Sequence, residues 1–301
     1  AIFDSILIQD AYSEFLTHSG AISMKVRNPE QISIPASNTT KDPGLTHSQI
    51  IRMVNLVKKT ENMNIFEELW ETLRNLFRSD KHSQTAARQI LKDAFYFQNC
   101  DGYSKYFTGA VDEKARDRFT HRLKKFNELK EHAKDPEMMQ ARGSISPDNM
   151  LCVSFYIGNI EIYTQKLQLG ISPSTGGIDL SNAYLSGISL NGACLRKADL
   201  SNAEMDKISL CSSNLLGADL HGAKMNNAKV ISSDLSDTNL SDTDMSDTDL
   251  DDTLLRNAKM DNTILNNAYM EDTNVRGINL SKADLSGQDS AKLRSRGAII
   301  D

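Results

Sequence analysis

The sequence SDLSDTNLSDTDMSDTDLDDTLL, residues 233–255, decides the fold of this chain. It contains eight Asp and neither Lys nor Arg, yet a Leu or Met recurs at every fifth position, 235, 240, 245, 250 and 255. A spacing of five matches neither the 3.6-residue period of a helix nor the two-residue period of a strand. The stretch therefore predicts a repeating structural unit of five residues.

The five-residue repeat extends well beyond this stretch. Every multiple of five from 180 to 285 is Leu, Met or Val, and the residue two places earlier is always Ala, Ser, Thr or Ile. Apolar residues at i and i−2 favour a short extended segment, and the period then requires a corner after each segment. Four such units close a square coil of about 20 residues, and stacked coils lie about 4.8 Å apart. The 22 units of the array correspond to 5.5 coils.

The motifs inside the array resemble those of the pentapeptide-repeat family. They include ADLSN at 198–202 and ADLHG at 218–222. The resemblance implies a right-handed quadrilateral β-helix, in which Leu and Met fill the interior. That family includes gyrase inhibitors and bacterial effectors secreted into host cells, so the resemblance implies the fold more strongly than the function.

The chain divides into three predicted parts, and its fold class is α plus β-solenoid. A helical domain covers 1–144, a linker and capping β-hairpin cover 145–177, and the pentapeptide-repeat β-helix covers 178–301. The hairpin is expected at 151–167, where apolar and polar residues alternate about Gly158-Asn159. The repeat fails at Gln288, and from this we expect a β-helix end without a cap, with room for further chain.

Helices are expected in five segments of the first part, because apolar residues recur there at helical spacing. The segments are 2–16, 46–59, 64–77, 83–99 and 114–133. The last holds seven Lys and Arg between 114 and 130. Two interpretations stay open for these cations: a solvated helix face, or contact with a membrane surface or an acidic partner.

Composition and motifs argue against an enzyme. The net charge is −6, and neither half of the chain is basic enough to suggest a nucleic-acid surface, which disfavours nucleic acid as a partner. The four Cys lack CxxC spacing, and the six His lack the spacing of a metal site. Phosphate-binding and nucleophile motifs are missing as well. We therefore expect neither catalytic residues, nor a cofactor, nor a metal.

The candidate site is a partner-binding surface on the β-helix. Its acidic part is a belt of about one coil, and its apolar part consists of side chains at positions that should face solvent. The candidate residues are Asp242, Asp244, Asp247, Asp249, Asp251, Asp252, Leu254, Ile264 and Tyr269. The Asp residues have three interpretations: residues that suit corners and solubility, a docking surface for a basic partner, or a weak divalent-cation site.

We interpret the protein as a non-enzymatic protein-interaction module, and we expect a bacterial effector that acts on a host protein. The expected location is the host cell, or otherwise the bacterial cytoplasm. One alternative is a DNA-mimicking gyrase inhibitor, which Lys259 disfavours by interrupting an acidic column. Another is the substrate-binding part of a HECT-like ubiquitin ligase with a catalytic domain after residue 301. Because the hairpin would cover one end of the β-helix, we expect a monomer.

Overall fold

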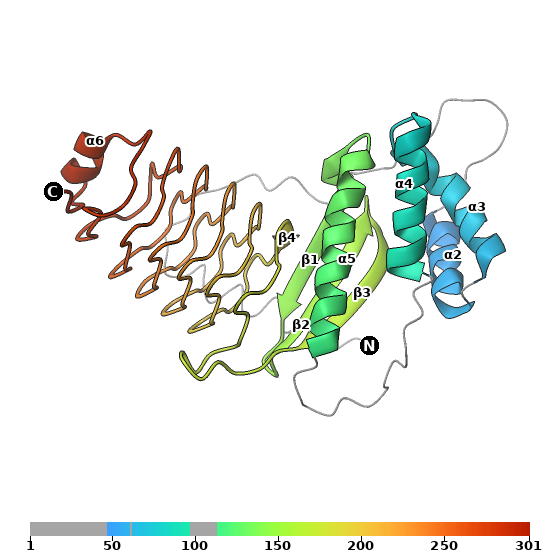
Figure 1. The fold of residues 1–301 in the computed structure, drawn as a ribbon, viewed down its shortest axis with the longest axis horizontal. Coiled ribbons are helices and arrows are strands. Elements are labelled where there is room, and N and C mark those ends of the chain that lie inside the picture. Colours follow the sequence, from blue (N-terminus) through green and yellow to red (C-terminus); the bar gives the residue numbers. More distant parts are fainter. Residues whose placement is uncertain (1–46, 61, 97–112) are drawn as a thin grey trace. The chain divides into compact units, whose positions relative to one another are not determined.

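The computed structural model describes residues 47–60, 62–96 and 113–301, all within one unit of the chain, Ala36–Asp301 (Figure 1). The helix expected at 2–16 and the end of the one expected at 83–99 lie outside these residues. The other expected helices are confirmed. They are α2 (His47–Thr60), α3 (Met63–Leu73), α4 (Lys81–Leu91) and α5 (Glu113–His132).

Short helical turns and side-chain caps set the helix ends. A 3₁₀ turn (Arg74–Leu76) follows α3, a π turn (Lys92–Tyr96) follows α4, and a second 3₁₀ turn (Pro136–Met138) follows α5. Asn62 Oδ1 accepts the backbone N–H of Asn64 at 2.9 Å and caps α3, and Asp80 Oδ1 accepts that of Ser83 at 2.8 Å and caps α4. Each cap satisfies a backbone donor that the helix itself leaves without a partner.

A four-stranded sheet follows the helices, in the order β3-β2-β1-β4. Strands β1 (Met139–Ile145), β2 (Met150–Ile157) and β3 (Ile160–Gln168) pair antiparallel, and the two-residue β4 (Ile188–Ser189) pairs parallel to β1. The hairpin predicted at 151–167 is confirmed as β2 and β3. Since β4 belongs to the first coil of the repeat array, the sheet runs directly into the β-helix.

The predicted position of the hairpin was wrong in one respect. The strand beside the first coil is β1, which the sequence pattern had assigned to the helical domain, so the hairpin lies one strand further away. Gly143 explains the close approach of β1. A Cβ at this position would come within 2.6 Å of the Leu190 side chain and 3.0 Å of Ile188. A glycine therefore leaves the space that the first coil fills.

Helix α5 packs on the sheet through Phe119, Leu123, Phe126 and Leu129, all of which are buried (Figure 1). The rings of Phe126 and Phe155 lie edge to face with centroids 5.0 Å apart. This face therefore forms an aromatic and aliphatic core between the helices and the sheet.

The repeat array winds as the five-residue period predicts. Residues 20 apart form parallel bridges on successive coils, such as Asp199 with Asp219. The N–H of Leu200 donates to Asp219 O at 2.7 Å, and the N–H of Asp219 donates to Ala198 O at 2.9 Å. Every Leu, Met and Val at a multiple of five from 180 to 280 is buried. Leu285, expected to be buried too, is only half-buried.

The corners of the coils depend on one backbone conformation. The residue two places after the buried Leu or Met has a positive φ at most corners, for example 56° at Asn202 and 58° at Asp237. Gly, Asn and Asp tolerate this left-handed region best. The corners thus explain why these residue types dominate the array.

The Asp199 carboxylate fixes the start of the array through hydrogen bonds. Ser172 and Ser174 donate hydroxyl hydrogen bonds to its Oδ2 at 2.6 and 3.0 Å, and Ser201 donates one to Oδ1 at 2.6 Å. Burial alone would raise the pKa of Asp199, but these hydrogen bonds outweigh it, and the pKa lies below its ordinary value. The carboxylate therefore joins the chain before the array to its second coil.

Buried hydroxyls join coil to coil inside the array. The Oγ1 of Thr243 donates to Leu220 O at 2.8 Å, that of Thr248 to Met225 O at 2.7 Å, and that of Thr253 to Val230 O at 2.9 Å. Each donor lies 23 residues after its acceptor, so each bond crosses from one coil to the preceding one. The narrow interior thus accepts Thr at i−2 only because the hydroxyl finds a carbonyl there.

Thr248→Val should lower the free energy of unfolding by about 1 kcal/mol, because the isosteric change removes the bond to Met225 O without creating a cavity. Urea unfolding followed by circular dichroism measures this loss. Thr248→Ser keeps the hydroxyl and serves as the control. Equal stability of the Val variant and the unaltered protein would contradict the role given to the hydroxyl.

The end of the array is not left uncapped, contrary to expectation. A short helix, α6 (Ser290–Ser295), interrupts the last coil. Gln288 Nε2 donates to Ala268 O at 2.7 Å, and the Arg296 guanidinium donates to Thr273 O and Met270 O. In earlier coils, the carbonyls at the positions equivalent to Ala268 and Thr273 also accept hydrogen bonds. Their donor is the backbone N–H of the residue 21 places further along the chain. Side chains thus replace donors that the helix removes from the ladder.

Candidate interaction surface

The acidic belt follows the corners of the array. Asp242, Asp247 and Asp252 occupy three successive corners with φ of 58°, 55° and 56°. Asp242 also accepts a hydrogen bond from Asn262 Nδ2 at 3.0 Å and lies 3.4 Å from His221 Nδ1. The interpretation that Asp suits the corners is therefore confirmed for these three residues.

The other belt residues hold the backbone in a second way. Asp244 Oδ1 accepts the N–H of Ser246 at 3.1 Å, and Asp249 Oδ1 accepts that of Asp251 at 3.3 Å. Asp251 Oδ1 in turn accepts the N–H of Glu271, one coil later, at 3.0 Å. Asn could form the same bonds, so the local geometry does not require the negative charge of these residues.

The three apolar candidates lie on different sides of the coil. Leu254, Ile264 and Tyr269 bridge Asp234, Asp244 and Asp249 respectively on the preceding coil. Leu254 is 46% exposed, Ile264 36% and Tyr269 62%. The structure places Ile264 and Tyr269 on either side of one corner, and it places Leu254 on a third side. The three therefore do not form one patch.

One coherent surface nevertheless remains. Ile264 and Tyr269 lie directly over Asp244 and Asp249, with Asp247 at the corner between the two Asp residues. We call these five residues the corner surface. It combines exposed apolar side chains with carboxylates on rigid backbone. Such a surface suits a partner with an apolar anchor and basic neighbours.

A pocket of about 240 Å³ lies beside Tyr269. Helix α6 contributes Lys292 and Leu293 to it, and the preceding coil contributes Met270 and Glu271. Lys292 Nζ forms an ion pair with Glu271 Oε1 at 2.8 Å. Analysis of the repeat missed these residues, because the helix that brings them together breaks the repeat.

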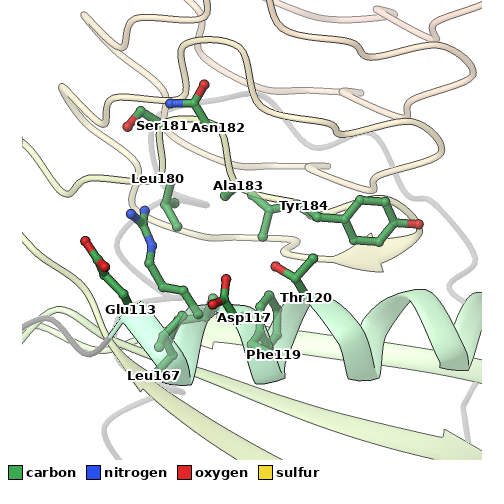
Figure 2. A pocket seen from close by; sticks show the side chains of 13 residues that line it. Glu113, Asp117, Phe119, Thr120, Leu167, Leu180, Ser181, Asn182, Ala183 and Tyr184 are labelled. Carbon is green, nitrogen blue, oxygen red and sulfur yellow. The ribbon is translucent and has the colours of Figure 1, made fainter.

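A second pocket, of about 330 Å³, lies between α5 and the first coil (Figure 2). In Figure 2, Asp117 and Thr120 of α5 lie on one side, and Asn182 and Tyr184 of the coil lie on the other. Sequence reasoning missed this pocket as well, since its two walls are some 60 residues apart in the chain.

Polar contacts along the same seam fix α5 to the coil. Arg116 Nη2 donates to Asp179 O at 3.0 Å, and Asn127 Nδ2 donates to Ser186 O at 2.8 Å. Lys124 Nζ lies 4.7 Å from the centre of the Tyr184 ring, a cation–π contact. The pocket therefore sits in a seam that joins the helix to the β-helix.

Several cations of α5 serve the protein interior. Arg122 is buried, donates to Ala94 O at 3.0 Å and stacks 4.3 Å from the centre of the Tyr163 ring. Burial lowers the pKa of Lys130, Glu137 opposes this shift, and Lys207 adds to it. Contact of 114–130 with a membrane surface or an acidic partner stays a prediction, resting on fewer cations than the sequence indicated.

The described residues hold neither a candidate membrane span nor a cluster of metal-ligating side chains. Within 47–60, 62–96 and 113–301, no helix is long and apolar enough to cross a membrane. In the same residues, no three His, Cys, Asp or Glu side chains gather closely enough to hold a metal ion.

Comparison with known sequences agrees with this architecture. The family described as pentapeptide repeats matches in eight copies over the segments 178–215, 193–230, 213–252, 233–272 and 248–287. The chain belongs to the pentapeptide-repeat proteins. It is homologous to Protein YabP of Escherichia coli K12, with 39% identity over 168 residues, which cover 52% of this chain and 75% of YabP.

Two solved structures are also similar. HetL, a protein involved in heterocyst differentiation regulation in Nostoc, is 26% identical with a TM-score of 0.33. That match spans 36% of this chain and 60% of HetL, less than two thirds of its length. QnrB1, a plasmid-mediated fluoroquinolone resistance protein, is 15% identical with a TM-score of 0.17, over 41% of this chain and 77% of QnrB1.

Proposed function

We propose that this protein is a non-enzymatic interaction module that binds a protein partner through the corner surface. The finer form of the proposal is a bacterial effector that acts on a host protein. The effector role rests on the pairing of a distinct N-terminal part with a pentapeptide-repeat β-helix, an arrangement that resembles such effectors.

A single observation supports the corner surface most directly. Tyr269 is 62% exposed, and it stands over the Asp249 carboxylate in a ladder of hydrogen-bonded coils. A large exposed aromatic side chain on rigid backbone loses little entropy on binding, and Tyr is enriched among residues that dominate interfaces. We therefore expect a basic partner surface with a recess for the Tyr269 ring.

The gyrase-inhibitor alternative finds less support. A DNA mimic needs a continuous column of exposed acidic groups along the coils. The relevant ladder runs through Asp179, Asp199, Asp219, Asn239 and Lys259. Asp179 pairs with Arg116, Asp199 is buried, and Lys259 carries the opposite charge. The half-buried Asp219 that remains is a poor copy of a row of phosphates.

The proposal is tested by neutralising the belt. Asp244, Asp247, Asp249 and Asp251 are changed together to Asn, which keeps the corner conformation and the local hydrogen bonds. We expect unchanged thermal unfolding and roughly tenfold weaker binding to the host protein captured by the unaltered chain. Binding of the unaltered chain should also weaken with added salt.

A matched control removes the same charge elsewhere. Asp206, Asp219, Asp234 and Asp261 lie outside the corner surface, and their change to Asn should leave the affinity unaltered. Tyr269→Ser should reduce binding without changing net charge. Equal loss in the belt variant and the control would reduce the effect to net charge and contradict the proposed surface.

A further inference from the structure

Two segments one coil apart repeat the same order of charges. They read DDTLLR at 251–256 and EDTNVR at 271–276. Leu254 and Asn274 form a parallel bridge, so the two segments stack in register. Acidic residues therefore lie over acidic residues at one corner, and Arg276 lies over Arg256 at the next. We call this side of the coil, residues 251–256 with 271–276, the bipolar side.

The bipolar side is open to solvent. Asp252, Arg256, Asp272 and Arg276 are all exposed, as is Leu254 between the two corners. Within the part of the chain that the structure describes, neither arginine forms an ion pair. The side thus presents an acidic edge, an apolar centre and a basic edge, and at the acidic edge Lys292 forms an ion pair with Glu271.

Stacking like charges is unfavourable within one chain. Two other ladders of this array alternate instead: Glu204, Lys224 and Asp244 along one side, and Lys229 followed by Asp249 along another. Asp179, Asp199 and Asp219 also stack like charges. There, however, Arg116 pairs with Asp179, and three serine hydroxyls donate to Asp199, so contacts within the fold stabilise the charges. Arg256 and Arg276 of the bipolar side have no such ion pair among the described residues. The repulsion on the bipolar side would be relieved by a surface carrying the opposite order of charges.

A second copy of this chain carries that order. If two bipolar sides face each other about a twofold axis parallel to the coil axis, the acidic edge of one copy meets the basic edge of the other. Leu254 then meets Leu254 at the centre. A twofold axis across the coils would instead oppose like charges. We propose that the bipolar side is the interface of a homodimer in which the two β-helices lie side by side and parallel.

The area of the bipolar side limits the affinity of the proposed homodimer. One side of a coil spans about 15 Å and five stacked coils about 24 Å, which gives roughly 360 Å² per copy. Stable dimers bury about 800 Å² per partner. The dimer is therefore weak, reversible and sensitive to salt. The expectation of a monomer considered only the ends of the β-helix, and the dimer is independent of the proposed host partner.

Sedimentation velocity of the full chain tests the proposal, from about 1 µM to about 500 µM protein. At low ionic strength the weight-average mass should rise with concentration toward that of two chains, and salt should reverse the rise. A monomer at every concentration would overturn the proposal. So would a dimer that charge reversal on the bipolar side leaves unchanged.

Charge reversals identify the interface. Asp252→Arg with Asp272→Arg makes the side basic on balance, with only Asp251 and Glu271 left acidic, and Arg256→Asp with Arg276→Asp makes it wholly acidic. Each variant alone should associate at least roughly tenfold more weakly, while an equal mixture of the two should associate again.

The charge-reversed variants should fold, and a matched control can be made on other sides of the coil. Lys197 and Lys207 already hold the corner conformation of Asp252, with φ of 55° and 58°, so a long basic side chain is tolerated there. The control, Lys207→Asp with Lys224→Asp, reverses two charges on other sides and should not change association. Failure of the mixed variants to associate would overturn the proposal, provided that circular dichroism shows both to be folded.

Discussion

Leu220→Asp protein is expected to lose the cooperative fold of its β-helix. Leu220 is 0% exposed, and its N–H bonds Asn239 O on the next coil at 2.8 Å. Its neighbours along the column are Leu200 and Leu240, so a carboxylate there would meet neither water nor a cation. An unpaired charge in such an interior should cost at least about 4 kcal/mol, a large part of the stability of a typical domain.

Circular dichroism and thermal unfolding measure this effect, and Leu254→Asp provides a matched control. Leu254 lies in the same array but points into solvent, 46% exposed. The same substitution should cost less than about 1 kcal/mol there. If Leu220→Asp were as stable as Leu254→Asp, the assignment of inward and outward positions would be wrong.

The interior of the array could be predicted from sequence because its period is local. A Leu or Met every fifth residue determines which side chains point inward, and the corner residues follow from the need for a positive φ. Each coil repeats the same contacts with its neighbours, so long-range pairing follows from counting 20 residues. The buried ladder and the Asp corners therefore agree with the structure.

The grouping of Leu254, Ile264 and Tyr269 shows how a local signal can be misjudged. Their separations of 10 and 5 residues place them on three different sides of a 20-residue coil. The sequence prediction treated one coil length as one surface and did not assign sides. Counting by fives would have placed Leu254 and Ile264 on opposite sides, with Tyr269 on the side between them.

The two ends of the array could not be predicted in this way. Strand β1 is short and alternates weakly, and its pairing with β4 depends on Gly143 meeting a segment 45 residues away. Helix α6 holds its place through Gln288 and Arg296, whose side chains bond carbonyls of an earlier coil. Such contacts arise only once the coils have been stacked.

The contacts of β1 and α5 with the first coil also explain how the open end of the β-helix is covered. A first coil exposes backbone groups that would pair with another chain unless something covers them. Here β1 occupies one side of that coil, and α5 lies along the seam through Arg116 and Asn127. The helical part and the repeat array are therefore bound by backbone and side-chain contacts that a flexible linker would lack.

Gly177→Ala should be the most damaging small change at the start of the array. A Cβ at Gly177 would lie 1.9 Å from the carbonyl oxygen of Lys197 and 2.8 Å from the backbone N of Ala198. Both atoms belong to the second coil, whose backbone is held by its own ladder of hydrogen bonds. Relieving the clash must separate the first corner from that coil, which should cost roughly 3 kcal/mol.

The neighbouring Gly176 offers a control with the same chemistry. Its φ is +70°, and a Cβ there would meet no atom within 4 Å. Gly176→Ala should therefore cost only about 1 kcal/mol, from backbone strain alone. Urea unfolding of the two variants separates these causes. Since a methyl group is added in both, an equal loss of stability would show that the contact with Lys197 does not hold the first corner against the second coil.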